Sequence, residues 1–393
     1  MKTTLLLLFV GLWAAALPAA ELPSQTDISL LQEVARGQER GTAWLVKQQE
    51  EDGSWRHHPA ITGLAITALA RGAQPPAAAI ERGVKFILRH VKPDGAIYGG
   101  GEADKYPNYS TAICAMALLA TGKPEALDAV KGARKFLLGS QFDEGEGYAT
   151  NNASYGGIGY GKRERPDLSN AQLALEAIRL TESLETGAGD ESPHTGTRLH
   201  WQKAVAFLAR CQNLPAGNDQ PWAKNTTSND LGGFIYMPGD ADQKIPPLSF
   251  ADADAGPTDV PQPLRSYGSM TYAGLKSFLY AELKKDDPRV QAALAWVKRN
   301  YTLEENPGLG AQGLFYYYHT FAKALSVYGE DTLADVAGRA HDWRYELMKK
   351  LVTLQKADGF WQNENNRWWE NDPVLCTSYS LLALNIVQAR RYP

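Results

Sequence analysis

One unit recurs along nearly the whole sequence, and this repeat limits the possible folds more than any other feature. WLVKQQEEDGSW at 44–55 joins an apolar, helix-spaced segment to glutamines, an Asp-Gly turn and a Trp, and LVTLQKADGFW at 351–361 has the same order. Four looser copies lie between them, each followed by a second segment rich in Ala, Ser, Thr and Leu. We therefore interpret the chain as six helical hairpins. They begin near Arg40, Arg82, Lys131, Lys203, Val290 and Tyr345.

The two segments of each unit differ in polarity. The first carries Lys, Arg, Gln and Glu on one face, whereas the second, such as ITGLAITALA at 61–70, has almost no charge. A helix that is apolar on all sides is buried on all sides. Few segments alternate in polarity as strands do. We predict an all-α fold, an α/α toroid of about six helical hairpins with an inner ring of apolar helices, an outer ring of amphipathic helices and a central cavity.

The N-terminus has the features of a secretory signal peptide. MKTTLLLLFVGLWAAALPAA places one Lys before an apolar run and small residues, which predicts a cleaved peptide over 1–20. The apolar run is short for a bilayer span, so an uncleaved anchor is the weaker alternative. We expect an exported protein, periplasmic or secreted, without a stable membrane span. Residues 21–393 then form a single toroid domain with a Pro- and Asp-rich insertion near 214–264.

Charge and cysteine content exclude two classes of protein. The 393-residue chain has a formal net charge of -4 and no long basic run, so we expect no nucleic-acid partner. Cys114, Cys211 and Cys376 are its only cysteines and allow one disulfide at most. A disulfide scaffold is therefore excluded, and stability must come from the core.

The Gln, Asp-Gly and Trp of the unit resemble the "QW" repeat of the terpenoid cyclase and protein prenyltransferase superfamily, which includes squalene–hopene cyclases. The resemblance spans the chain after the signal peptide, but the middle units are degenerate, since Asp94-Gly95 is followed by no Trp. It implies the α/α toroid and leaves the activity open, because a fold does not fix a function. The matching residues are Gln48, Asp52, Gly53 and Trp55 in unit one and Gln355, Asp358, Gly359 and Trp361 in unit six.

The resemblance to hopene-type cyclases implies an Asp-x-Asp-Asp motif whose protonated acid attacks an alkene. The nearest string, FADADAGPTD at 250–259, contains Asp252, Asp254 and Asp259 but has Ala255 in place of the last Asp. It also lies in the insertion, where a solvated loop is the simpler interpretation.

The resemblance to prenyltransferase β-subunits implies zinc bound by an Asp-x-Cys pair and a His. YYYHTFAKAL supplies His319, but the preceding inner helix offers Ser269 and Thr271 instead of Asp and Cys. Asp372 and Cys376 could replace them only by departing from the family pattern. We predict no metal and no other cofactor, with zinc as the weaker alternative.

Aromatic or charged residues precede all six inner helices, whose starts face one mouth of the predicted cavity. Each also has a structural explanation: aromatic residues fill cores, and Asp before a helix is a common N-cap. As predicted catalytic residues we name His319, Asp372, Tyr318, Glu370 and Asp167, with His319 as a general base or ligand. As predicted ligand-binding residues we name Tyr109, Tyr267, Tyr272, Tyr316, Tyr317, Trp368 and Trp369.

We expect an exported protein, similar to squalene cyclases and prenyltransferases, that binds or acts on a small apolar, isoprenoid-type ligand in its cavity. An aromatic funnel suits a prenyl chain or a developing cation. If it is an enzyme, the resemblance implies a terpene cyclase-like isomerase or a prenyltransferase. Two alternatives remain: a carbohydrate-active toroid enzyme using Glu370 and Asp167 as paired carboxylates, and a non-catalytic interaction module. The sequence predicts no particular protein partner.

Overall fold

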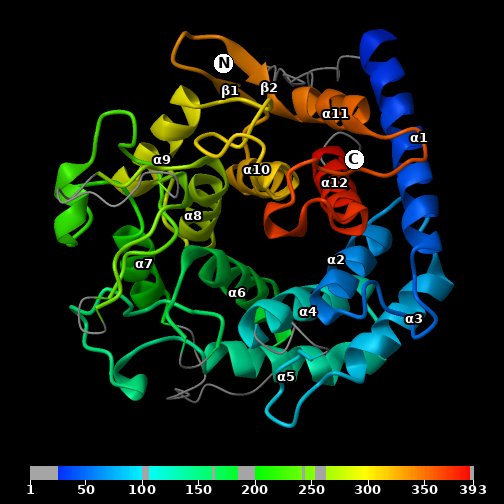
Figure 1. Ribbon diagram of the computed structural model, residues 1–393, viewed down its shortest axis with the longest axis horizontal. Helices are drawn as coiled ribbons and strands as arrows, with labels where there is room; N and C mark the ends of the chain where they lie inside the picture. Colours follow the sequence, from blue (N-terminus) through cyan, green and yellow to red (C-terminus); the bar gives the residue numbers. More distant parts are fainter. Residues whose placement is uncertain are drawn as a thin grey trace, which may run out of the picture.

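A computed structural model of the chain describes residues 25–99, 106–161, 164–184, 200–240, 244–252 and 263–389. These residues form twelve α-helices arranged in two concentric rings (Figure 1). The outer ring comprises α1 (Gln25–Lys47), α3 (Ala77–Leu88), α5 (Leu127–Leu138), α7 (Trp201–Arg210), α9 (Pro288–Arg299) and α11 (Trp343–Leu354). The inner ring comprises α2 (Pro59–Ala70), α4 (Pro107–Thr121), α6 (Leu168–Leu180), α8 (Gly268–Tyr280), α10 (Leu314–Tyr328) and α12 (Pro373–Gln388).

The inner ring is closed. Each inner helix packs on the next one in the chain, and the last, α12, packs on the first, α2. The predicted all-α fold and toroid architecture are therefore confirmed. The strands in the described residues are β1 (Thr332–Ala334) and β2 (Ala340–Asp342), an antiparallel pair between α10 and α11 in which Leu333 lies opposite His341. The predicted signal peptide at 1–20 lies outside the described residues.

Burial follows the polarity of the two segment types. In α2 every residue from Pro59 to Leu69 is buried, as the nearly charge-free sequence requires. In α3 the apolar residues Ile80, Val84 and Ile87 face inward, whereas Glu81 and Lys85 are exposed and form an ion pair. Helices that are buried on one face therefore form the outer ring, and helices that are buried on all sides form the inner ring.

The Trp of the terminal units joins the outer helix to the inner one. Trp55 is fully buried, and its Nε1 donates to the carbonyl oxygen of Leu45 in α1 at 2.8 Å. Its backbone N–H donates to the Thr62 hydroxyl of α2 at 3.0 Å. Trp361 makes the equivalent bond to Leu351 in α11 at 2.7 Å. These tryptophans therefore hold the hairpin together and lie away from the central cavity.

The Gln of each terminal unit joins that unit to the following one around the ring. Gln355 Nε2 donates to the carbonyl of Gly359 in its own turn and to that of Gly37 in α1, both at 2.7 Å. In unit one the equivalent residue is Gln49, which bonds Gly53 and Ala79, both at 2.9 Å. The assignment to Gln48 was wrong by one position, since Gln355 precedes Trp361 by the same spacing as Gln49 precedes Trp55.

The turn glycine is required by its conformation and by its neighbour. Gly53 has φ +90°, a region that L side chains rarely adopt. A Cβ there would lie 2.6 Å from the carbonyl oxygen of Arg82 in α3. The Asp-Gly turn is therefore the point at which neighbouring outer helices come into contact.

No helix among the described residues is long and apolar enough to cross a membrane. Cys114, Cys211 and Cys376 are all free and buried. The fold is thus held by its apolar core and by the contacts of the turns, without a cross-link between these cysteines.

Candidate functional site

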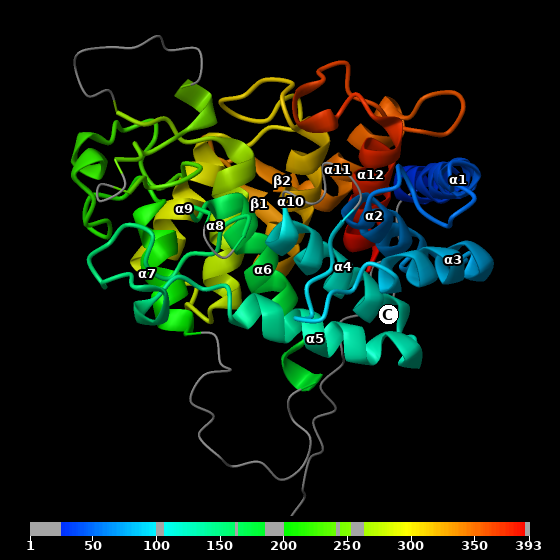
Figure 2. The ribbon, with the colours of Figure 1, turned by 60° about the horizontal axis from the view of Figure 1, so that its bottom comes forward.

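The inner helices enclose a channel with two chambers. The first residues of the inner helices line an upper chamber of about 310 Å³, and residues two to three turns later line a lower one of about 30 Å³. All six helices therefore run in the same direction along the channel. In Figure 2 the green connection before α8 and the orange-red connection before α12 rise on the same side of the ring.

The upper chamber, called here the aromatic chamber, has walls made mostly of aromatic rings. Glu370 is the one carboxylate in its wall, and no Lys or Arg side chain lines it within the described residues. Ile61, Leu64, Met270 and Leu375 supply aliphatic surface. The aromatic residues are Tyr106, Tyr109, Tyr160, Tyr236, Phe250, Tyr267, Tyr316, Trp368, Trp369 and Tyr379.

The structure places five of the seven predicted ligand-binding residues in this wall: Tyr109, Tyr267, Tyr316, Trp368 and Trp369. Whether they bind a ligand stays a prediction. Several wall residues were missed because they lie in loops or past the first turn of a helix. Tyr236 and Phe250 come from the insertion near 214–264, which is therefore part of the chamber and not only a solvated loop; the other aromatic wall residues not among the predicted ones are Tyr106, Tyr160 and Tyr379.

Tyr272, Tyr317 and Tyr318 lie outside the aromatic chamber. The hydroxyls of Tyr317 and Tyr318 donate to the backbone carbonyls of Thr302 and Leu303, both at 2.7 Å. The Tyr272 ring packs on Tyr317, with centroids 5.6 Å apart. The reason is helical geometry, because positions 316, 319, 320 and 323 share the channel face of α10 and the two residues after Tyr316 point elsewhere. These three tyrosines are core residues.

Trp368 and Trp369 stand at the mouth of the chamber. They are 42% and 49% exposed and adopt left-handed backbone angles, with φ of 54° and 64°. Such angles cost energy in residues other than glycine and are often found at binding sites. Trp369 contacts His58 edge-on, with ring centroids 6.0 Å apart. Burial lowers the pKa of His58 to about 4, so this wall residue is neutral.

Glu370 caps a helix from within the chamber wall. Its carboxylate accepts the backbone N–H groups of Phe315 and Tyr316, at 3.1 and 2.7 Å, at the start of α10. Asn363 Nδ2 donates to it at 2.7 Å. Burial raises the pKa of Glu370 despite these bonds. Its oxygens are therefore occupied by the N-terminus of α10, where the helix dipole favours a negative group.

Asp167 and Asp372 also cap helices. Asp372 accepts from the backbone N–H of Val374 at 2.8 Å, and it pairs with Arg56 at 2.7 Å away from the chamber walls. Asp167 accepts from the backbone N–H of Asn170 at 2.9 Å and is fully buried. Both capping alternatives are thus realised.

Asp167 is linked to the aromatic chamber by tyrosines. Burial raises its pKa from 3.8 to about 6, against the hydrogen bonds from Asn170 and Tyr236. The hydroxyl of Tyr236 lies 3.0 Å from that of Tyr160, and both residues line the chamber. A carboxyl group that is partly protonated near pH 6 therefore stands behind the chamber wall.

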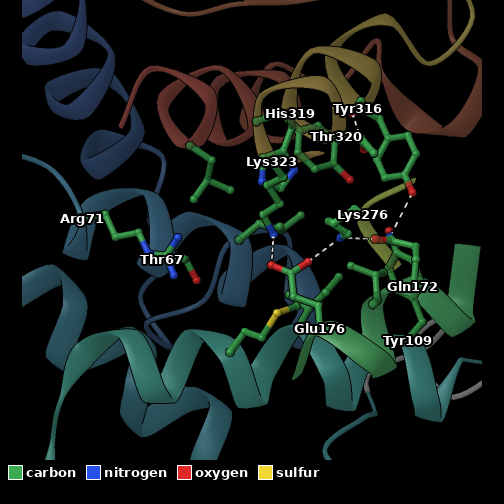
Figure 3. Close-up of a pocket in the computed structure, with 16 residues that line it drawn as sticks. Thr67, Arg71, Tyr109, Gln172, Glu176, Lys276, Tyr316, His319, Thr320 and Lys323 are labelled. Carbon is green, nitrogen blue, oxygen red and sulfur yellow. Dashed lines mark hydrogen bonds and ion pairs between the residues drawn. The ribbon is translucent and has the colours of Figure 1, made fainter. Parts of the chain in front are cut away.

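The lower chamber, called here the charged chamber, contains three ion-paired residues that the sequence interpretation did not single out. Glu176 of α6 accepts from Lys276 of α8 and from Lys323 of α10, both at 2.6 Å (Figure 3). Lys276 also donates to Gln172. Burial opposes ionisation of Glu176, but the two ammonium groups outweigh it and hold the pKa of the carboxyl well below its usual value. The sequence did contain a signal for these three residues, since each is a charged residue within a mostly apolar inner helix.

His319 lies in the charged chamber and not at the mouth of the channel. Its ring stacks on Tyr379 with centroids 5.4 Å apart, and Nε2 is buried without a hydrogen-bond partner among the described residues. Burial and the neighbouring Lys323 hold the pKa of His319 well below its usual value. The imidazole is therefore neutral, and its function as a base or ligand stays a prediction.

The residues considered for a zinc site or an acid motif are held by other contacts. The described residues contain no group of three or more His, Cys, Asp or Glu side chains placed to hold a metal ion. Cys376 Sγ donates to the carbonyl of Glu370 at 2.9 Å. Asp252 accepts from the backbone N–H of Arg265 at 2.9 Å, while Asp254 and Asp259 lie outside the described residues.

Comparison with solved structures supports the fold. A type II terpene cyclase from Scytonema, MstE, superposes with a TM-score of 0.51 at 13% identity over 91% of this chain and 98% of that one. A Candida albicans protein geranylgeranyltransferase-I (TM-score 0.48, 13% identity, 91% and 92% covered) and a glycosidase solved with glucose (0.46, 12%, 93% and 99%) are less similar. No family model matches the sequence, and no curated protein is significantly similar to it. At these identities the likeness concerns the fold alone.

Proposed function

We propose that the protein binds an isoprenoid-type hydrocarbon ligand in the aromatic chamber. The observation that carries this proposal is the wall itself, in which ten aromatic rings surround about 310 Å³ of space. That volume lies at the lower end of the range for small-molecule sites, about 300–1,000 Å³. No Lys or Arg of the described residues lines the chamber. We therefore propose that the part of the ligand held there is uncharged and carries no diphosphate group.

The chemistry that suits this chamber best is cyclisation started by proton transfer. A proton added to an alkene leaves a carbocation, which aromatic faces stabilise. Asp167 is the proton source we propose, because its raised pKa keeps it partly protonated near pH 6 and Tyr236 connects it to the chamber. The carboxylate left behind would regain a proton when the final cation loses one, so the reaction is an isomerisation without net proton consumption. We further propose that the protein acts after export.

Calorimetric titration with farnesol, a neutral prenyl alcohol, tests the binding proposal. Trp369→Ala removes a half-exposed wall residue, and its loss should weaken binding about tenfold, as expected for about 1.4 kcal/mol of lost apolar contact. Trp44→Ala is the matched control, because this Trp packs on Phe360 away from the chamber walls. Equal affinities for farnesol in both variants, or no binding by the wild type, would overturn the proposal.

A carbohydrate ligand is the second candidate, favoured by the exposed indoles of Trp368 and Trp369, whose faces can stack on sugars. A paired-carboxylate mechanism is less favoured, because Glu370 is occupied by the start of α10. The same titration with a panel of oligosaccharides separates the candidates. Binding of an oligosaccharide, with none of farnesol, would favour this second function.

A further inference from the structure

The charged chamber has a surplus of positive charge that the ion pairs within it do not cancel. Lys276 and Lys323 face a single carboxylate, Glu176. Arg71, which follows α2, lines the same chamber, and its side chain makes no hydrogen bond within the described residues (Figure 3). A purely structural ion pair would need only one lysine for one glutamate. The second cation makes the chamber attractive to an anion.

The donors of this chamber are only partly used. A lysine ammonium has three N–H donors. In the described residues Lys323 uses one of them, on Glu176, and Lys276 uses two, on Glu176 and Gln172. Each oxygen of Glu176 accepts one ammonium, and the remaining ammonium donors have no hydrogen-bond acceptor among the described residues. An added acceptor would therefore complete the pattern.

His319 points to the same conclusion independently. The residue is 5% exposed, lines the charged chamber, and has a buried Nε2 with no hydrogen-bond partner in the described part of the chain. Leaving a buried polar atom without a hydrogen-bond partner is energetically unfavourable. In its Nε2–H form the ring can donate to an anion placed between it and Lys323. A buried N–H donor without a partner, near ammonium groups with unused donors, is the arrangement expected of an anion-binding site.

We propose that the charged chamber binds one carboxylate group through Lys276, Lys323 and His319, with Arg71 at its edge. A volume of about 30 Å³ fits a group of that size and is too small for a larger ligand. Tyr109, Tyr316 and Tyr379 line both chambers, so the two spaces adjoin. The carboxylate is then the head of an amphiphile whose apolar body lies in the aromatic chamber. This last step rests on the proposed function, whereas the carboxylate site does not.

Titration at pH 7 with farnesoic acid and farnesol, which share one prenyl chain, tests the amphiphile. Wild-type protein should bind the ionised acid at least tenfold more tightly than the alcohol. Lys323→Met should remove most of this preference without changing the affinity for farnesol. Arg71→Gln, at an exposed position that does not threaten folding, should reduce the preference by a smaller factor. Lys350→Met is the matched control, because its ammonium pairs with exposed Glu304 on the outer side of the ring.

A second arm uses acetate alone and decides the source of the carboxylate. Acetate, against chloride at equal ionic strength, should raise the melting temperature of the wild type but not of Lys323→Met. An acetate effect without any preference for farnesoic acid would support the site and assign it to a free carboxylate. If farnesol and farnesoic acid both fail to bind, the proposed function fails and the acetate arm still decides the site. The inference is overturned if neither the acid preference nor the acetate effect depends on Lys323.

Discussion

Helix α6 carries two buried carboxyl groups that behave in opposite ways. Asp167 caps its first turn beside the aromatic chamber, has no cation hydrogen-bonded to it within the described residues, and has a pKa raised to about 6. Glu176 lies more than two turns later in the charged chamber, where two lysines hold its pKa well below the usual value. The same helix and the same degree of burial thus give a proton-holding acid at one end of the channel and a permanent anion at the other.

The difference shows that burial alone does not set the charge of a carboxyl group. Desolvation raises the pKa of both groups, and only the ammonium partners reverse its effect at Glu176. The two ends of the channel are therefore suited to different ligand chemistry. The upper end can hold a neutral hydrocarbon beside a protonated acid, whereas the lower end is an ionic site.

The largest effect on stability is expected from removing the carboxylate of the charged chamber. Glu176→Leu leaves Lys276 and Lys323 without their shared partner and should destabilise the fold by about 3–5 kcal/mol in urea unfolding at pH 7. Adding both Lys276→Met and Lys323→Met should recover most of that loss, because apolar residues of similar size replace the whole buried ionic group at little cost. Glu182→Leu, which removes an exposed ion pair with Arg179, should change stability by less than about 0.5 kcal/mol. A loss below 1 kcal/mol in Glu176→Leu would show that the lysines find other partners.

The next effect tests the opposite behaviour of Asp167. Its folded pKa of about 6 exceeds the ordinary 3.8, so between these pH values the folded protein holds a proton that the unfolded chain has lost. The free energy of unfolding that Asp167 contributes should therefore fall as pH rises from about 4 to 6. The expected decrease is up to about 3 kcal/mol, at 1.36 kcal/mol per pKa unit. Asp167→Asn should lack this part of the pH profile, measured by urea unfolding across the range. A wild-type profile retained in the variant would assign the pH dependence to other groups.

A smaller effect concerns the link between Asp167 and the chamber. The hydrogen bond from Tyr236 lowers the pKa of Asp167. Tyr236→Phe should therefore raise that pKa by a fraction of a unit to one unit, followed by carbon-13 NMR of the carboxyl during a pH titration. Tyr318→Phe is the control, since its hydroxyl bonds the Leu303 carbonyl and lies off the chamber walls. An unchanged midpoint in Tyr236→Phe would mean that the link to the chamber is broken in solution.

The last comparison separates the outer ring from both chambers. Gln49→Ala removes a hydrogen bond within its own turn, to Gly53, and the bonds to Ala79 and Arg82 of the next unit, and it should cost about 1–2 kcal/mol of unfolding free energy. Gln48→Ala, the neighbouring control, should change it by less than about 0.5 kcal/mol. Neither variant should alter the affinity for farnesol or farnesoic acid. A change in either affinity would show that the channel depends on the contacts of the outer turns.

Much of the architecture could be predicted because it depends on periodic features. The alternation of one-sided and all-round apolar helices indicated two rings, and the aromatic starts of the inner helices pointed to the chamber. The Gln was assigned one position too early, because adjacent glutamines are indistinguishable until the partners of Gln49 are seen. Tyr317 and Tyr318 were predicted together with Tyr316, but a helix turns adjacent residues onto different faces.

The sequence by itself determined the helical class, the ring of hairpins and the aromatic character of one end of the channel, since all three depend on local spacing and polarity. Only the tertiary structure decided which residues meet across the channel. Glu176, Lys276 and Lys323 lie far apart in the chain, and ring closure alone brings them together. Whether a buried carboxyl group is protonated or ionised depends on these contacts, because an ammonium group within hydrogen-bonding distance outweighs the effect of desolvation on the pKa. Asp167 and Glu176 therefore differ for a reason that their places in one helix do not reveal.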